Sequence, residues 1–309
     1  MPPESAYHTP VLAREVIELL APRPDGIYLD GTAGGGGHAR SILEASAPGG
    51  RLFALDRDED AVRAAGYALE AYGERVAIRQ GNFREAHGIL DGTAFDGILL
   101  DLGVSSHQLD STHRGFSCDR NGPLDMRMDK TSGASAAEVL ARIDQTELAR
   151  AIREYGESRF SRKIARELVR RRDETPLTET AQLAEAIRSA VPRQAERKNV
   201  VQVFQALRIL VNDELGALRD GLDVLFSMLV PGGRLAVISY HSLEDRLVKR
   251  FFSRLTKSCI CPPQAPVCTC GGRAAARPLT RKPVRPQAQE LADNPRSRSA
   301  KLRAVEKMS

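Results

Sequence analysis

A glycine-rich turn between an apolar stretch and a helical stretch most limits how this 309-residue chain can fold. The apolar stretch Ile27–Asp30 ends in an acid, and residues 31–38 follow as Gly-Thr-Ala-Gly-Gly-Gly-Gly-His. A helix is expected from there to about Ser46. Glycine lacks a Cβ, so such a turn can bend sharply and approach a ligand closely. A strand ending in an acid, then this turn, then a helix indicates a nucleotide-binding site.

The segments around this turn predict a doubly wound α/β sheet. Four further apolar stretches are predicted strands: 51–56, 76–78, 95–101 and 235–239. Helices are predicted between and before them: 10–20, 58–72 and 213–229. Strands that alternate with helices pair in parallel. Residues 299–307 are expected to form a final strand, whereas residues 255–296, rich in Pro, Gly, Arg and Cys, are expected to be loosely structured.

The alternation of strands and helices stops in the middle of the chain. No strand is predicted from about Val104 to Leu210, and helical periodicity instead marks 158–172, 178–190 and 200–212. The first of these helices carries a basic stripe: Arg159, Arg162, Lys163, Arg166 and Arg170. The chain is therefore predicted to form one α/β domain in two parts, 1–105 and 211–309, interrupted by a helical insertion at 106–210.

Two ligand classes fit the glycine-rich turn, dinucleotides and S-adenosylmethionine. Asp56 ends the second strand 20 residues after Gly36, where an acid can accept hydrogen bonds from ribose hydroxyls. The turn lacks the usual G-x-G-x-x-G register, and Asp30 could hold a ligand ammonium, which nicotinamide cofactors lack. The stretch Leu229–Leu235 also resembles the Pro-Gly-Gly turn before the fifth strand of Rossmann-like methyltransferases. Together these features favour S-adenosylmethionine.

Longer motifs extend over nearly the whole chain. They are Tyr7–Leu12, Asp30–Thr32 with Gly36–His38, Leu99–Ser106, Arg114–Ser117, Gly122–Asp129, Phe204–Ile209, His241–Arg246 and Asn294–Ser299. In these motifs the chain resembles the bacterial 16S ribosomal RNA (cytosine-N4)-methyltransferases, the MraW or RsmH family. The resemblance implies a Rossmann-like class I methyltransferase sheet, with an inserted all-helical domain for RNA recognition.

The resemblance also implies the ligands and the reaction. The cofactor would be S-adenosyl-L-methionine, and the reaction would methylate the N4 amine of one cytidine in the decoding centre of 16S rRNA, within an assembled small subunit. The cofactor contacts of the family correspond to Gly36, Gly37, His38, Asp56, Phe83, Asp101 and Gln108. Two alternatives stay open: a core aromatic ring for Phe83 and a hydrogen bond at the helix start for His38.

Methylation of a cytosine amine needs a proton acceptor, because the N4 lone pair is delocalised into the ring. Asp101, at the end of the fourth strand, is the first candidate, and His241, after the fifth strand, is the second. Many amino-methyltransferases carry an acid or Asn followed by Pro-Pro and an aromatic residue, where this chain has Asp-Leu-Gly-Val. A hydrogen bond that shapes the loop is an equally good interpretation of His241.

The target base must also be splayed out of the folded RNA. Phe116 could stack on such a base, and Arg114 and Arg127 could bind its phosphates, since all three follow the fourth strand on one long loop. Met126 and Met128, in the same loop, are expected to pack against the inserted helices.

Charge is unevenly distributed along the chain. Residues 246–309 hold 15 Lys and Arg against 3 Asp and Glu, whereas the rest of the chain carries a net negative charge. A basic end on an acidic body favours a polyanionic partner such as nucleic acid, and a solvated tail is the alternative. We expect this region and the basic stripe of residues 159–172 to contact rRNA phosphates. A non-catalytic RNA-binding factor for ribosome assembly is the alternative to an enzyme.

The cysteine pattern and the N-terminus bear on location. Cys118 stands alone, and Cys259, Cys261, Cys268 and Cys270 lie within twelve residues. Two Cys-x-Cys pairs could bind zinc, but one intervening residue makes a cramped chelate, so reduced thiols without a metal are favoured. No run of 18 apolar residues and no apolar leader is present. A cytoplasmic protein is therefore expected.

Overall fold

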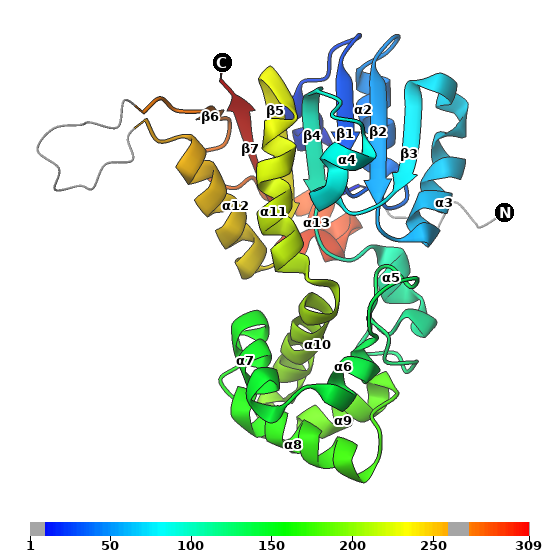
Figure 1. The fold of residues 1–309 in the computed structure, drawn as a ribbon, viewed down its shortest axis with the longest axis vertical. Coiled ribbons are helices and arrows are strands. Elements are labelled where there is room, and N and C mark those ends of the chain that lie inside the picture. The colour runs from blue at the N-terminus through cyan, green and yellow to red at the C-terminus, as the bar shows by residue number, and fades with distance from the viewer. Residues whose placement is uncertain (1–9, 259–271, 309) are drawn as a thin grey trace, which may run out of the picture. The chain divides into compact units, whose positions relative to one another are not determined.

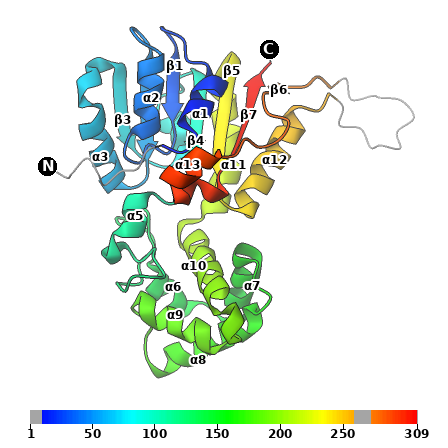
Figure 2. The ribbon, with the colours of Figure 1, turned by 180° about the vertical axis from the view of Figure 1, so that it is seen from behind.

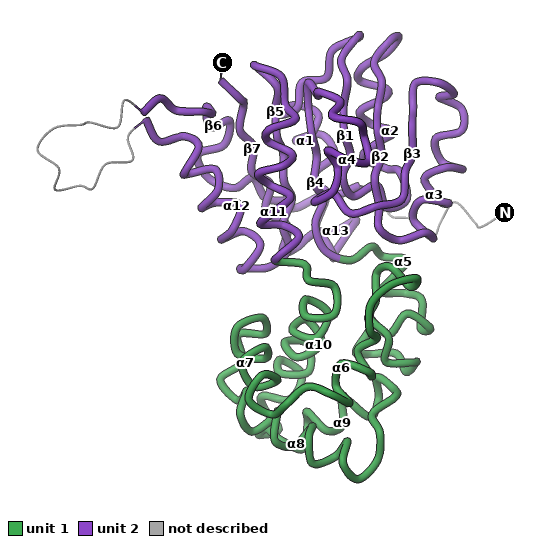
Figure 3. Tube along the Cα trace, viewed as in Figure 1, with its two compact units in different colours: residues 1–6, 104–215 green, residues 7–103, 216–309 purple. Residues whose placement is uncertain are grey.

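The computed structural model describes residues 10–258 and 272–308. These residues form two compact units (Figure 3). The helical unit is Val104–Leu215, and the α/β unit consists of the described parts of Tyr7–Gly103 and Gly216–Ser309. The chain leaves the α/β unit once and later returns to it. Among the described residues, no helix combines the length and the apolar character that crossing a membrane requires.

A seven-stranded sheet forms the centre of the α/β unit, in the order β3-β2-β1-β4-β5-β7-β6 (Figure 1). The strands are β1 (Ile27–Asp30), β2 (Arg51–Asp56), β3 (Val76–Gln80), β4 (Phe95–Asp101), β5 (Leu229–Ser239), β6 (Ala276–Pro278) and β7 (Lys301–Lys307). The first five strands pair in parallel, β7 is antiparallel to β5, and β6 is antiparallel to β7. The doubly wound α/β prediction and the final strand are confirmed.

Helices cover both faces of this sheet (Figures 1 and 2). They are α1 (Ala13–Leu20), α2 (Gly37–Ala45), α3 (Glu59–Leu69), α4 (Ala86–Ile89), α11 (Glu214–Ser227), α12 (Ser242–Leu255) and α13 (Ala288–Asp293). Along β4, Ile98 and Leu100 join the hydrophobic core that contains α11 and α12 residues, whereas Leu99 joins the core on the α1 and α2 face. Burial on both faces explains why Ile98–Leu100 are consecutively apolar instead of alternating with polar residues.

Residues 255–296 are more ordered than the sequence suggested. Their described part contains β6, which pairs with β7 at the edge of the sheet, and α13. The prediction of a loosely structured segment is wrong for these elements. Strand β6 is ordered by pairing with β7, and α13 is bonded to the start of α1, so local composition did not reveal either element. Pro278 is tolerated because β6 is a short edge strand.

A long-range hydrogen bond attaches α13 to the start of α1. Oε1 of Glu290 accepts the backbone N–H of Leu12 at 2.8 Å. Leu12 is the N-cap residue of α1 and has a left-handed backbone, with φ of 55°. Leu12 has no polar side chain to cap the first helical turn, and the carboxylate that accepts its own amide comes from 278 residues further along the chain.

The helical unit contains α5 (Ser106–Asp110), α6 (Ala136–Arg142), α7 (Gln145–Gly156), α8 (Ser161–Glu174), α9 (Thr180–Ser189) and α10 (Glu196–Asn212). The last three match the predicted helices, whereas α6 and α7 were not predicted. Ser135 and Asp144 cap α6 and α7 with their side chains. One hydrophobic core joins these helices to the long loop before α6.

Candidate functional site

The glycine-rich turn links β1 to α2 through a short, fixed backbone path. Gly36 is the N-cap residue of α2 with φ of 82°, and a Cβ there would lie 3.3 Å from Leu69 Cγ. The amide of Ala33 donates to the carbonyl of Leu55 on β2 at 2.8 Å, and that of Gly36 donates to Ala33 at 2.8 Å. The turn therefore lies against β2, at the carboxyl edge of the sheet, where strand order reverses between β1 and β4. Ligands bind at this edge in doubly wound sheets.

Asp56, at the end of β2, is bonded to the turn itself. Its Oδ2 accepts the N–H of Gly34 at 2.9 Å, and its Oδ1 accepts the N–H of Asp58 at 2.9 Å. Burial raises the pKa of Asp56 to about 6, against the lowering effect of these hydrogen bonds. A carboxylate oxygen can accept more than one hydrogen bond, so Asp56 retains acceptor capacity. Its role in holding the turn was not foreseen from the sequence.

Asp30, at the end of β1, is almost completely buried, with 1% of its surface exposed. Its Oδ1 accepts the N–H of Thr32 at 3.1 Å, but its Oδ2 is buried and accepts no hydrogen bond from the described residues. Burial raises the pKa of this carboxyl to about 6, and the nearby charge of His38 opposes that rise. A buried carboxylate oxygen without a hydrogen-bond partner costs free energy of folding. A cationic group of a ligand would provide that partner.

Asp101, at the end of β4, is held from several directions. Its Oδ1 accepts the phenol of Tyr240 at 2.9 Å, and its Oδ2 lies 3.5 Å from His38 Nε2 as an ion pair. Its backbone N–H donates to Thr32 Oγ1 at 2.6 Å. The start of α2 and the residue after β5 thereby hold this carboxylate, and the turn holds the backbone of Asp101.

His38 lies in the first turn of α2 and is 6% exposed. Burial lowers the pKa of His38, but the carboxylates of Asp101 and Asp30 outweigh this effect, so its pKa is raised. The structure therefore brings two predicted site residues together in one ion pair, the buried His38 and the half-buried Asp101. A hydrogen bond confined to the helix start does not describe His38, because its ring faces β4.

Tyr240 was missed by the sequence reasoning. It follows β5 directly, and the phenol lies beside Asp101. Burial, followed by the charge of Asp101, raises the pKa of Tyr240 well above its usual value, which keeps the phenol a proton donor. An aromatic residue after an apolar strand is most simply read as part of the core. The only feature of the sequence that pointed to a role of Tyr240 in the site was its position next to His241, a predicted site residue.

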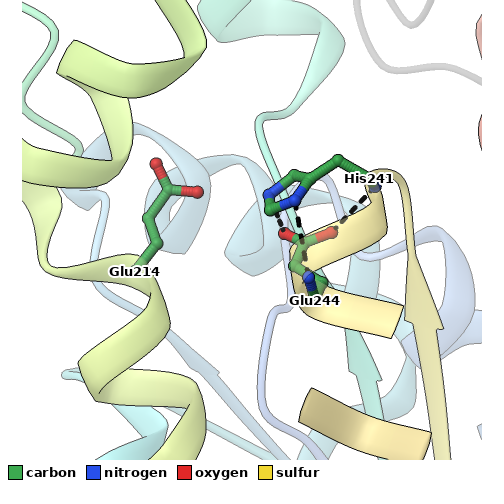
Figure 4. Close-up of side chains that lie close together, drawn as sticks. All are labelled: Glu214, His241 and Glu244. Carbon is green, nitrogen blue, oxygen red and sulfur yellow. Dashed lines mark hydrogen bonds and ion pairs between the residues drawn. The ribbon is translucent and has the colours of Figure 1, made fainter. Parts of the chain in front are cut away.

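His241 is the N-cap residue of α12 and interacts chiefly with Glu244 (Figure 4). Its Nδ1 accepts the N–H of Glu244 at 3.4 Å, and its Nε2 lies 3.1 Å from Glu244 Oε1. Oε2 of Glu244 accepts the N–H groups of Tyr240 at 2.8 Å and His241 at 3.3 Å. This reciprocal arrangement matches the loop-shaping interpretation of His241, and a role in proton transfer stays a prediction.

Phe83 and Gln108 lie in different units. Phe83 begins a 3₁₀ helix after β3 and is half-buried, and a Cβ on Gly221 of α11 would come within 2.5 Å of its ring. The ring thus contacts the core, as the alternative interpretation expects, and an adenine contact stays a prediction. Gln108 is a buried residue of the helical unit, and its Oε1 accepts the N–H of Ser105 at 2.9 Å in a capping box.

The long loop after β4 corrects two expectations about RNA contacts. Arg114 is 1% exposed and donates to the carbonyls of Arg127 and Met128, at 3.1 and 2.9 Å. Phe116 is buried in the core of the helical unit. Neither is placed to stack on a base or bind a phosphate, so that prediction is wrong for both. The expected packing of Met126 and Met128 is confirmed.

Arg127 and the basic C-terminal region are partly engaged in ion pairs. Arg127 pairs with Asp125 at 2.8 Å. In the C-terminal region, Lys301 and Arg303 both pair with Asp245, at 3.1 and 2.7 Å, and Arg277 pairs with Glu306 at 2.8 Å. Part of the positive charge after Arg246 therefore stabilises the α/β unit instead of facing a partner. Cys259, Cys261, Cys268 and Cys270 lie outside the described residues.

The strand order, the glycine-rich turn and the carboxylates at the strand ends define a Rossmann-like fold of the kind that class I methyltransferases have. The sequence model of the MraW methylase family matches residues 5–308, and the chain belongs to that family. It is therefore an enzyme, and the non-catalytic alternative is set aside. Its methyl donor is S-adenosylmethionine.

Curated relatives match the chain along its length. A protein of Symbiobacterium thermophilum named ribosomal RNA small subunit methyltransferase H is 52% identical over 98% of this chain and 97% of its own. One of Syntrophotalea carbinolica with the same name is 51% identical over 99% of both chains. Among solved structures, an rRNA methylase from Streptococcus thermophilus is 10% identical, with a TM-score of 0.44 over 96% of this chain and 94% of its own.

The residues at the edge of the sheet fit this cofactor. S-adenosylmethionine carries ribose hydroxyls, an ammonium and a sulfonium. Asp56 offers acceptor oxygens beside the glycine turn, and the unpartnered Oδ2 of Asp30 suits a cationic group. A backbone without Cβ atoms permits close approach.

Proposed function

We propose that this enzyme transfers a methyl group from S-adenosylmethionine to the N4 amine of a cytidine in the decoding centre of 16S rRNA. The small-subunit rRNA is supported by the names of relatives about 50% identical over nearly the whole chain. The reaction at an amine is supported by one observation: Asp101 presents a carboxylate at the switch point, held by Tyr240 and His38.

The chemistry assigned to the chain is positioning and proton acceptance. The cofactor supplies an electrophilic methyl group. As the new N4–carbon bond forms and the sulfur–carbon bond breaks, one N4 proton must leave, and we assign its acceptance to Asp101. His241 is the second candidate acceptor. Holding the amine in line at near-attack distance contributes the larger part of the acceleration, and an acceptor in reach adds about 10²–10⁴-fold.

We assign cofactor binding to the residues named from the sequence: Gly36, Gly37, His38, Asp56, Phe83, Asp101 and Gln108. The hydrogen bonds of Asp56 to the turn support its place beside the ribose, since the same carboxylate fixes the turn and retains acceptor capacity. Asp30 is assigned to the ammonium group. The partner is 16S rRNA in an assembled small subunit, and the location is the cytoplasm.

Methyl transfer to small subunits purified from cells lacking this protein tests the proposal. Labelled S-adenosylmethionine and mass mapping of the rRNA should locate one N4-methylated cytidine in the decoding centre. Asp101→Asn should lower kcat by about 10²-fold or more. Asp223→Asn, on the exposed side of α11, removes a carboxylate from the same unit and should leave kcat unchanged. Label at another nucleotide would contradict the proposed substrate.

A further inference from the structure

The first half of α8 and the residue before it carry four cations that no acid neutralises. Arg159, Arg162, Lys163 and Arg166 are all exposed. Among the described residues, no carboxylate forms an ion pair with any of them. The guanidinium of Arg159 lies 4.8 Å from the centre of the Phe160 ring.

The second half of the same helix differs. Arg170 pairs with Glu167 at 2.7 Å and with Glu174 at 2.6 Å. Arg171 pairs with Glu167 at 3.1 Å and with Glu185 at 3.2 Å. The basic stripe predicted from the sequence is therefore two stretches, one unpaired and one neutralised within the protein.

A second set of unpaired cations comes from the segment that joins α9 to α10. Arg188, Arg193, Arg197 and Lys198 are exposed, and within the described residues none of them has an ion-pair partner. Burial raises the pKa of the Cys118 thiol, and Arg197 and Arg188 both oppose that rise. The hydroxyl of Ser189, next to Arg188, donates to Oε1 of Glu167, next to Arg166, at 3.2 Å, so the end of α9 lies beside α8.

Two hydrogen bonds, one of them buried, join the start of α8 to the start of α10. The hydroxyl of Ser158 donates to Oδ1 of Asn199, and both residues are buried. Nε2 of Gln202 donates to the carbonyl of Glu157 at 3.3 Å. Arg159 follows Ser158 and Lys198 precedes Asn199, so the start of α8 and the start of α10 lie together. We call the eight cations of the two sets the basic end.

The basic end has a large excess of positive over negative charges, which favours a polyanionic partner. Segments 157–166 and 188–198 contain these eight cations and only two acids, Glu157 and Glu196. Unpaired like charges repel one another, which is tolerated at a surface that meets an anionic partner. The buried hydrogen bond between Ser158 and Asn199 joins the two helix starts, so the cations beside them gather on one part of the surface, which suits a polyanionic partner.

We propose that the basic end binds backbone phosphates of the substrate RNA, and that Arg170 and Arg171 of the same helix do not. This inference rests on the proposed function, which makes the substrate an RNA. It moves the expected contact from the whole of residues 159–172 to the first half of α8 together with the start of α10.

Three double variants of the full chain test this surface. Arg162→Gln/Lys163→Gln and Arg197→Gln/Lys198→Gln each remove two charges from the basic end. Arg170→Gln/Arg171→Gln, the matched control, removes two charges from the same helix outside it. Binding to unmethylated small subunits and to protein-free 16S rRNA is measured over a series of KCl concentrations, and thermal melting shows that each variant is folded.

Each of the first two variants should reduce the slope of log K against log salt by about 1.5, because each lost phosphate contact removes about 0.7–0.9. The control should keep the wild-type slope. KM for subunits should rise with kcat little changed. An unchanged slope in both basic-end variants, or an equal loss in the control, would overturn the inference. Wild-type protein that binds RNA but methylates no subunit would instead contradict the proposed function.

Discussion

The phenol of Tyr240 donates a hydrogen bond of 2.9 Å to Oδ1 of Asp101, across the ends of the neighbouring strands β4 and β5. The bond fixes the rotation of the carboxylate and leaves its Oδ2 facing His38. Because Asp101 is the proposed proton acceptor, Tyr240 acts as its positioning residue.

Tyr240→Phe should lower kcat about 5- to 30-fold, since a hydrogen bond to a charged group contributes about 1–2 kcal/mol when its loss leaves the acceptor misplaced. The affinity for S-adenosylmethionine should change little. Steady-state kinetics and calorimetry measure the two quantities. Tyr72→Phe is the matched control, because its phenol bonds an exposed carboxylate, Glu44, at 3.1 Å. A kcat equal to that of the control would remove Tyr240 from this role.

Asp56→Ala should weaken S-adenosylmethionine binding tenfold or more, because charge-assisted hydrogen bonds to ribose contribute about 1.5–3 kcal/mol each. The structure adds a second effect. The amides of Gly34 and Asp58 would lose their acceptor, so the free energy of unfolding should also fall. Calorimetry gives the affinity and urea unfolding gives the stability. Unchanged affinity with reduced stability would leave Asp56 a purely structural residue.

Asp30→Asn should stabilise the cofactor-free protein at pH 8. The pKa of Asp30 is raised from 3.8 to about 6 by burial, so the folded state holds this proton more tightly than the unfolded state. The buried charge therefore destabilises the fold above about pH 6, by up to about 3 kcal/mol. This penalty shrinks as pH falls from about 6 to about 4, where the variant loses its advantage.

Urea unfolding at pH 4, 6 and 8 checks the effect of Asp30. The same substitution should weaken cofactor binding, because an amide cannot pair with an ammonium as a carboxylate does. A variant that is no more stable than the wild type at pH 8 would mean that the unpartnered oxygen carries no cost. Undiminished affinity for S-adenosylmethionine would place the ammonium elsewhere.

His241→Ala should lower the free energy of unfolding by about 0.5–2 kcal/mol, the usual effect of losing an N-cap. His241→Asn should recover most of that loss, because asparagine is a good N-cap residue. Activity then separates the two interpretations of His241. If the asparagine variant is as stable as the wild type but loses kcat as severely as Asp101→Asn, the ring is needed for proton transfer.

Local patterns predicted the sheet because its strands are short, apolar and separated by clear turns. Strand β4 was recognisable since both of its faces are buried. Strand β6 and helix α13 were not, because their order depends on partners far away in the chain.

The candidate site was predictable where chemistry follows strand ends, as at Asp56 and Asp101. It was not predictable where burial decides a role. Arg114 looks like a phosphate ligand in the sequence, yet it bonds two backbone carbonyls inside the helical unit. Tyr240 looks like core, yet its hydroxyl reaches a charged group. Charge and residue type can be read from a sequence, but the partner of a buried polar atom cannot.

The hydrogen bond between Leu12 and Glu290 joins an early part of the chain to a late one, and β7 lies between β5 and β6 in the sheet. These contacts can form only near the end of synthesis. A ribosome makes α1 first and must make the whole helical unit before it reaches α13 and β7. The helical unit can fold early, because the residues that form its core are close together in the chain. The sheet of the α/β unit cannot be completed until its last strand has been made. A nascent chain would therefore expose the cations of the basic end before it has a finished methyltransferase sheet.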